Sequence, residues 1–290
     1  MSSTQALITK TKQFIPSDTT YGKPRLSNKG GKTIPLHMNG RNLVLQFPLV
    51  LTWGVNCWDT DGSDYKKYDL NLQFGDRSPD NSTSEGYFFA ALKQLQEKIL
   101  SDAVKNSKEW FGKAKMSREV AEALMYPILK YPKDKSTGEP DMSRYPTVKL
   151  RLPYWEDVFK LELYDMNKNP LYLPPSKDGT QGNWKQPADL IPSRSHVKGL
   201  MECTGVWHAG GKFGVSWKLV QAQVRPPVRI QGFCIMDDSD DEDVENSAAA
   251  NDELEGFGQS NAPSFSSDEE VVAAPPKKKK SKKKVVRKKQ

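Results

Sequence analysis

The chain has 290 residues, of which 36% are hydrophobic and 10% aromatic, and it carries a formal net charge of +7. It contains no apolar run of about 18 residues, which excludes a membrane-spanning helix, and its N-terminus lacks the apolar stretch of a secretory signal. Cys57, Cys203 and Cys234 lie far apart in the sequence. An odd number of scattered cysteines argues against a disulfide framework and suits a reducing compartment. Together with the missing apolar run and secretory signal, this predicts an intracellular protein with no membrane partner.

The charge is unevenly distributed along the chain. Residues 237–270 contain 13 acidic residues and no lysine or arginine, whereas residues 277–289 contain 10 basic residues. The remaining residues, 1–236, hold 33 basic and 23 acidic side chains, a surplus of +10. Like-charged blocks with few apolar residues stay solvated, so we expect a disordered acidic tail (237–270) and a basic terminus (275–290). The basic body indicates a polyanionic partner such as nucleic acid.

The first part of the chain predicts extended structure followed by strands. Residues 1–40 are rich in Lys, Gly, Ser, Thr and Pro and are expected to form an extended N-terminal segment. Apolar runs follow at 43–47 and 49–53. Pro48, which lies between them, cannot donate to a ladder, and this predicts two short strands or one bent strand near a sheet edge. Residues 65–74 alternate between apolar and polar types, which predicts a half-buried strand.

Two helices are expected next. Ser82 and Glu85 form a capping-box pattern that predicts a helix start. An apolar stripe at three- and four-residue spacing then indicates one buried helix face ending near Ser107; its members are Phe88, Leu92, Leu95, Ile99 and Ala103. A second, shorter helix is predicted after Ser117, and Pro127 ends it.

Strands resume in the second half of the chain. Short strands are predicted at 147–152, 158–164 and 171–173, with polar loops around them. The clearest hairpin joins 200–208 to 212–224 through a glycine-containing turn. Its second arm places one set of side chains on a single face, namely Phe213, Val215, Trp217 and Leu219.

Six or seven short strands interrupted by a helix pair predict an α+β fold over residues 41–230. We expect an antiparallel OB-like (oligonucleotide-binding-like) β-barrel with a helical insertion at about 82–126, because the loops of such barrels tolerate large insertions. Periodicity alone does not distinguish this barrel from another arrangement of sheet and helices.

The sequence offers little for catalysis or metal binding. Gly30-Gly31-Lys32-Thr33 resembles part of a phosphate loop, but Leu26 occupies the position of the first required glycine and Pro35 prevents a helix from following. The three histidines and the pairing of Cys203 with His208 do not supply four zinc ligands at characteristic spacing. We therefore predict a protein that is not an enzyme and has no cofactor and no metal.

Interleaved aromatic and basic residues are typical of single-strand binding, in which bases stack on exposed rings while Lys and Arg contact phosphates. The candidate nucleic-acid-binding residues are Lys23, Arg25, Trp53, Trp58, Tyr65, Lys66, Lys67, Tyr68, Trp207, Lys212, Phe213 and Lys218. The alternative is that the rings form the core. Core positions are favoured for Phe213 and Trp217, which share an apolar face, whereas Trp58 and Tyr65 flank a polar turn and are expected to be exposed.

Three segments carry a family resemblance. KMSREVAEALMYPILKYPKDKSTGEP (115–140), YPTVKLRLP (145–153) and GVWHAGGKFGVSWKLVQAQV (205–224) resemble the single-stranded DNA-binding proteins of nucleocytoplasmic large DNA viruses, especially the phycodnavirus branch. The resemblance covers roughly residues 40–230. It implies an OB-like fold, no enzymatic activity, and a role in coating single strands during viral replication or recombination.

The functional prediction is a non-catalytic single-stranded DNA-binding protein, with RNA as an alternative ligand. The acidic tail is expected to compete for the binding groove and to contact replication proteins. The lysine run near the C-terminus has the pattern of a nuclear import signal, which an import receptor binds. This predicts localisation to the host nucleus or the viral replication site. The lysines of the signal are Lys277, Lys278, Lys279, Lys280, Lys282, Lys283 and Lys284. The alternative function is a nuclear or virion scaffold protein whose basic tip serves import or DNA packaging.

Overall fold

The computed structural model describes residues 7–27, 30–59, 66–75, 82–175, 185–228 and 235. The acidic tail, the basic terminus with its import signal, and Tyr65 lie outside the described residues.

Five strands pair in a ring. They are β7 (Val44–Asp59), β8 (Lys66–Gln73), β10 (Thr147–Leu152), β15 (Ser195–Ala209) and β16 (Lys212–Arg225). The hydrogen-bonded order is β7–β8–β10–β16–β15, and β15 pairs again with β7. All these pairings are antiparallel except β10–β16, which is parallel. A ring with an odd number of strands must contain at least one parallel contact, so the antiparallel arrangement expected from the sequence needs correction at β10–β16 alone.

Each strand of the ring buries one of its two sides. Leu70 and Leu72 of β8 are fully buried, and so is Leu150 of β10. In the β15–β16 hairpin, Phe213 and Trp217 are also buried, as the alternation of the second arm predicts. The hydrophobic core therefore lies on one side of these strands, and their other side carries polar and charged residues.

Short strands extend this framework and give the N-terminal segment more structure than an extended chain. They are β1 (Thr9–Lys10), β2 (Thr20–Tyr21), β3 (Arg25–Leu26), β4 (Lys32–Ile34), β5 (Leu36–Met38), β6 (Arg41–Asn42), β9 (Met125–Tyr126), β11 (Tyr154–Trp155), β12 (Val158–Phe159), β13 (Glu162–Tyr164) and β14 (Pro170–Tyr172). β4 pairs with β15, and β1 pairs with β7. The strand at β4 also confirms that no helix follows the Gly30-Gly31 pair.

Four α-helices are present in the described residues: α1 (Ser84–Lys105), α2 (Ser107–Phe111), α3 (Arg118–Leu124) and α4 (Pro187–Leu190). The capping residue of α1 is Thr83, one residue later than predicted, and its hydroxyl accepts a hydrogen bond from the Gly86 amide at 2.9 Å. Ser117 caps α3 as predicted. None of the helices in this described part has the length and apolar character needed to cross a bilayer.

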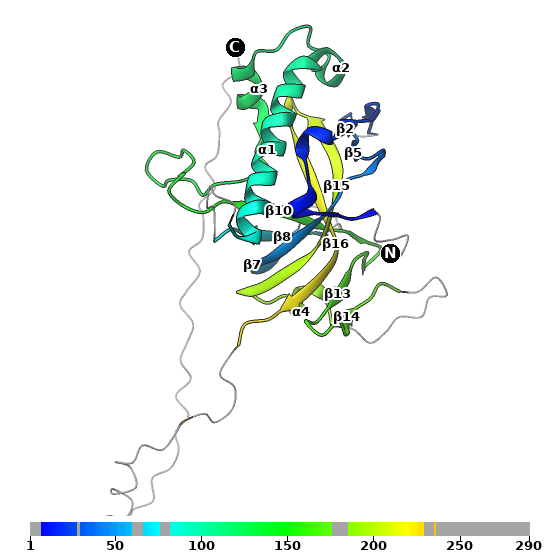
Figure 1. Ribbon diagram of the computed structural model, residues 1–290, viewed down its shortest axis with the longest axis vertical. Helices are drawn as coiled ribbons and strands as arrows, with labels where there is room; N and C mark the ends of the chain where they lie inside the picture. The colour runs from blue at the N-terminus through cyan, green and yellow to red at the C-terminus, as the bar shows by residue number, and fades with distance from the viewer. Residues whose placement is uncertain are drawn as a thin grey trace, which may run out of the picture. The chain divides into compact units, whose positions relative to one another are not determined.

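The predicted apolar stripe of α1 is confirmed, because all five of its members are buried. Phe88 packs against Phe47 of β7 and against Phe74, with ring centroids 6.2 Å and 5.4 Å apart. Burial of each large apolar side chain contributes about 1.5–3 kcal/mol. Figure 1 shows α1 beside the strands, α2 and α3 at one end of the long β15–β16 hairpin, and β13 and β14 toward its other end.

Two strand predictions need correction. β7 runs through Pro48 as one strand, which agrees with the second of the two predicted alternatives, but it is not an edge strand, since it pairs with both β8 and β15. The ladder with β15 shifts register between Val197 and Gly199, opposite Pro48, and this bulge accommodates the missing N–H donor. The predicted strand 158–164 is two strands, β12 and β13, which pair with different partners.

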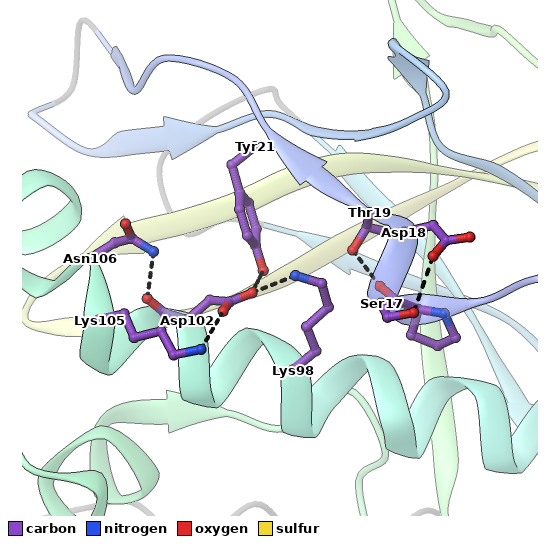
Figure 2. Close-up of polar contacts among 9 residues, drawn as sticks. Ser17, Asp18, Thr19, Tyr21, Lys98, Asp102, Lys105 and Asn106 are labelled. Atoms are coloured by element: carbon purple, nitrogen blue, oxygen red, sulfur yellow. Dashed lines mark hydrogen bonds and ion pairs between the residues drawn. The ribbon is translucent and has the colours of Figure 1, made fainter.

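A polar cluster joins the N-terminal segment to α1 (Figure 2). The Tyr21 hydroxyl donates to Asp102 at 2.9 Å, and Lys98 contacts the same carboxylate at 2.5 Å. The Lys98 ammonium also lies 5.0 Å from the centroid of the Tyr21 ring. Burial and the neighbouring Asp102 carboxylate raise the pKa of Tyr21, so its hydroxyl stays a donor at physiological pH.

Tyr21→Phe is expected to lower the free energy of unfolding by about 1.5–3 kcal/mol, because it removes a hydrogen bond to a charged group. The matched control is Tyr87→Phe, at an exposed tyrosine of α1 whose ring lies under Lys12. This control should change the free energy by no more than about 0.5 kcal/mol. Urea denaturation measures both, and equal values for the two variants would contradict a stabilising role for the Tyr21 hydroxyl.

Candidate nucleic-acid interface

The polar side of β8, β10 and β16 gathers basic residues. Arg151 of β10 lies opposite Asp69 of β8 and beside Lys218 of β16 in the register of the strands. Lys67 lies two residues before Asp69, and Lys149 two residues before Arg151, so they share this side of the sheet. The alternation that buries Leu70 and Leu150 thus points these cations away from the core.

A small hairpin, β11–β12, stands at the edge of this basic surface. Its turn residues Glu156 and Asp157 have positive φ values of 53° and 57°, a conformation typical of tight two-residue hairpin turns. The Tyr154 hydroxyl donates to Asp157 at 2.9 Å. The rings of Tyr154 and Phe159 each lie within 4.8 Å of the Tyr68 ring, centroid to centroid, which anchors the hairpin on β8.

The hairpin presents Trp155, which is 60% exposed. Together with the strands it encloses a cleft of about 260 Å³. We call this site the basic cleft; its cationic lining residues are Lys66, Lys67, Arg151, Lys160 and Lys218, and its aromatic ones are Tyr68, Tyr154 and Trp155. No acidic residue is among the described residues that line it. Such a lining is suited to a polyanion that carries aromatic rings.

Within the described residues, at least three of the five cations that line the cleft have no ion pair with a carboxylate. Lys218 forms an ion pair with Glu202 at 3.0 Å. In contrast, no carboxylate within the described part of the chain forms an ion pair with Lys67, Arg151 or Lys160. Unpaired cations on a common surface attract phosphate groups over distances of about 10 Å at moderate salt.

A second exposed indole lies next to the cleft. Trp58 of β7 is 55% exposed and sits directly opposite Lys67 in the β7–β8 ladder. Its Nε1–H donates to the Asp69 carboxylate at 2.6 Å. Trp53, earlier on the same strand, is 53% exposed and its Nε1 lies 3.4 Å from Oε1 of Gln73. The expectation that Trp58 is exposed is therefore confirmed.

The structure brings only some of the predicted binding residues together. Four of them line the basic cleft: Lys66, Lys67, Tyr68 and Lys218. Lys212, at the turn end of the β15–β16 hairpin, lies about 20 Å along β16 from Lys218 at the usual rise per residue. Lys23 and Arg25 are exposed on the N-terminal segment, where Arg25 pairs with Thr33 of β4. Neither Lys23 nor Arg25 lines the basic cleft.

Of the predicted aromatic residues, Phe213 is too deeply buried to stack a base, and Trp207 does not line the basic cleft. Phe213 is 1% exposed and its ring lies 4.9 Å from that of Phe111, so its assignment as a binding residue is wrong. Trp207 is half-buried, with its ring 6.3 Å from that of Tyr126. Both belong to the end of the hairpin that packs against β9 and α2, where apolar surface is covered. Tyr65 lies outside the described residues.

Four of the cationic and aromatic cleft residues were missed by sequence reasoning, namely Arg151, Tyr154, Trp155 and Lys160. The signal for Arg151 was present in the alternation of TVKLRL, which assigns Lys149 and Arg151 to the polar side. Trp155 precedes a turn, and neither its exposure nor its neighbours follow from the local pattern.

With regard to metals, no cluster of three or more His, Cys, Asp or Glu suitable for an ion occurs in the described ranges.

Comparison with known proteins gives structural similarity only. No protein-family model matches the chain, and no curated protein matches it. The single-stranded DNA-binding protein from bacteriophage Enc34, in complex with ssDNA, is similar with 12% identity and a TM-score of 0.37, over 72% of this chain and 98% of that chain. Gp2.5, a single-stranded DNA-binding protein encoded by bacteriophage T7, is similar with 14% identity and a TM-score of 0.32, over 76% and 100% of the two chains. These comparisons give no support for the nucleocytoplasmic large DNA virus family.

Proposed function

We propose that this protein binds single-stranded nucleic acid without catalysis, and that its five-stranded ring is an OB-like barrel. The observation that carries this proposal is the basic cleft, in which five cations and the exposed Trp155 surround one cavity beside Trp58. Phosphates of a single strand contact the cations, and bases stack on the indoles. Base stacking of this kind contributes about 1–3 kcal/mol per base and depends little on sequence.

Titration with oligonucleotides of equal length tests this function. Oligo-dT is expected to bind more tightly than a duplex, because paired bases are not available to the indoles, and to quench tryptophan fluorescence on stacking. Oligo-rU in the same titration measures the preference for DNA over RNA. The logarithm of the affinity should fall with the logarithm of the salt concentration, with a slope of about −0.7 for each phosphate contacted. Equal affinity for oligo-dT and duplex, or fluorescence that oligo-dT leaves unchanged, would contradict the proposal.

The acidic block, residues 237–270, is proposed to compete with nucleic acid for the basic cleft and to contact replication proteins when displaced. A tethered competitor acts at an effective concentration of about millimolar when its linker spans the distance. A chain ending at Ala274, which keeps only the acidic block, should therefore bind oligo-dT more weakly than a chain ending at Met236. Equal affinities across a salt series would rule out this competition.

The basic terminus, residues 275–290, is proposed to be an import signal, which suits a role in viral DNA replication in the host nucleus. A fluorescent protein carrying residues 275–290 should accumulate in the nucleus, and an even distribution between nucleus and cytoplasm would contradict this.

The alternative function, a scaffold protein, calls for a flat apolar surface. A cleft lined by cations favours the nucleic-acid ligand instead.

A further inference from the structure

Asp69 is an acidic residue within the surface proposed to bind phosphates. A carboxylate there should repel a polyanion, so its presence requires a physical reason. Its side chain is only 5% exposed, and burying a charged carboxylate costs free energy unless the carboxylate is paired and hydrogen-bonded. Three side chains donate to the Asp69 carboxylate and offset this cost, namely Asn56, Trp58 and Lys149.

The two carboxylate oxygens of Asp69 receive bonds from both neighbouring strands. Oδ2 accepts the Trp58 Nε1–H at 2.6 Å and contacts the Lys149 ammonium at 2.7 Å. Oδ1 accepts from the side-chain amide of Asn56 at 3.1 Å. Since Trp58 and Asn56 belong to β7 and Lys149 to β10, the carboxylate of β8 joins all three strands. Through the bond to Nε1, Asp69 holds the edge of the Trp58 indole, although Trp58 is 55% exposed.

Lys149 completes the arrangement. Its ammonium lies over the Trp58 ring, 5.6 Å from the ring centroid, which is within the range of a cation–π interaction. The indole is therefore held at its edge by Asp69 and contacted on one face by Lys149. An exposed side chain that is immobilised before binding loses less conformational entropy when a base stacks on it.

We propose that Asp69 is a positioning residue, which holds the Trp58 indole in the orientation that stacks a nucleobase and keeps Lys149 against the ring rather than on a phosphate. The proposal rests on the proposed function. It assigns to a carboxylate on the cationic surface a favourable effect on binding, opposite in sign to its simple electrostatic effect.

Asp69→Asn in the full chain tests the proposal by the sign of its effect on oligo-dT affinity. The substitution removes a negative charge, so a merely repulsive carboxylate predicts tighter binding. A positioning carboxylate predicts binding weakened about fivefold or more, the lower end of the effect of losing one stacked base. In a Trp58→Ala background the weakening should disappear, because no indole remains to be oriented.

Glu202→Gln is the matched control. Glu202 is a second, partly buried partner of the basic residues on this surface, and it pairs with Lys218 and accepts from Asn42 rather than from an indole. Removing its charge should tighten binding, the opposite of the result expected for Asp69→Asn. Asp69→Glu keeps the charge but moves the carboxylate by one methylene, so it should weaken binding as well and serves if Asp69→Asn fails to fold.

The indole N–H signals in a nitrogen-15 NMR spectrum of the free protein provide a readout that does not depend on binding. The chain has 7 tryptophans, and the signal lost in Trp58→Ala should shift in Asp69→Asn. Tighter binding by Asp69→Asn, equal weakening with and without Trp58, or an unshifted signal would each overturn the proposal. If the unmodified protein does not bind oligo-dT, the proposed function fails, while the NMR shift still reports the bond between Asp69 and Trp58.

Discussion

Trp155→Ala and Trp58→Ala are each expected to weaken oligo-dT binding by about 1–3 kcal/mol, which corresponds to about 5- to 150-fold in affinity. Both side chains are more than half exposed. Trp58 belongs to β7, which pairs with one edge of β8, and Trp155 belongs to β11, which follows the strand β10 that pairs with the other edge of β8. Truncating them removes stacking platforms and leaves the cations in place. The loss should therefore be nearly the same at low and at high salt, and the salt slope should not change.

Fluorescence anisotropy of a labelled oligonucleotide measures these affinities across a salt series. Tyr87→Ala is the control, since Tyr87 is a partly exposed aromatic residue on α1 that does not line the cleft. The affinity of the Tyr87→Ala variant for the oligonucleotide should match that of the unmodified protein. Thermal unfolding checks that the tryptophan variants remain folded. Unchanged affinity in both Trp155→Ala and Trp58→Ala would mean that the bases do not stack on this surface.

Simultaneous replacement of Lys67, Arg151 and Lys160 by alanine is expected to weaken binding about a hundredfold at 0.1 M salt. The magnitude follows from counterion release, since a slope of about −0.7 per contact makes each phosphate contact worth about fivefold between 0.1 M and 1 M salt. The salt slope should become shallower by about 2, and the affinities of the variant and the unmodified protein should converge near 1 M salt.

The matched control replaces three exposed lysines outside the cleft, namely Lys93, Lys108 and Lys115. It removes the same charge from the molecule, so any difference between the two triple variants measures position rather than net charge. If both variants lose the same affinity and the same slope, the basic cleft is not the path of the nucleic acid. The tryptophan and lysine variants thus distinguish stacking from phosphate contacts by their salt dependence.

Local patterns in the sequence were sufficient for much of the fold. The apolar stripe of α1 and the alternation of β16 each predicted the buried side of one element, because a helix or strand repeats its contacts at a fixed period. The same alternation assigned Lys218 to the polar side. Pro48 misled the prediction only about the sheet edge, since a register shift in the ladder with β15 accommodates the proline inside the sheet.

The candidate site was only partly visible. Lys66 and Lys67 were found because they lie near aromatic residues in the sequence, a criterion that also selected Phe213, which is buried. Arg151 and Trp155 were missed because their partners, Lys67 and Lys218, are about 65 to 85 residues away along the chain, and no local period reports such a contact.

The sequence by itself determined the long strands of the hairpin, the helix pair, the charged blocks and the basic surplus of the body, because these properties depend on composition and on short-range periodicity. Only the tertiary structure decided which cations and rings share a surface. The parallel contact of β10 with β16 places Arg151 beside Lys218, and the β11–β12 hairpin brings Trp155 to them. The physical reason is that the order of strands in the ring is set by the packing of their buried sides, which couples residues distant in the chain.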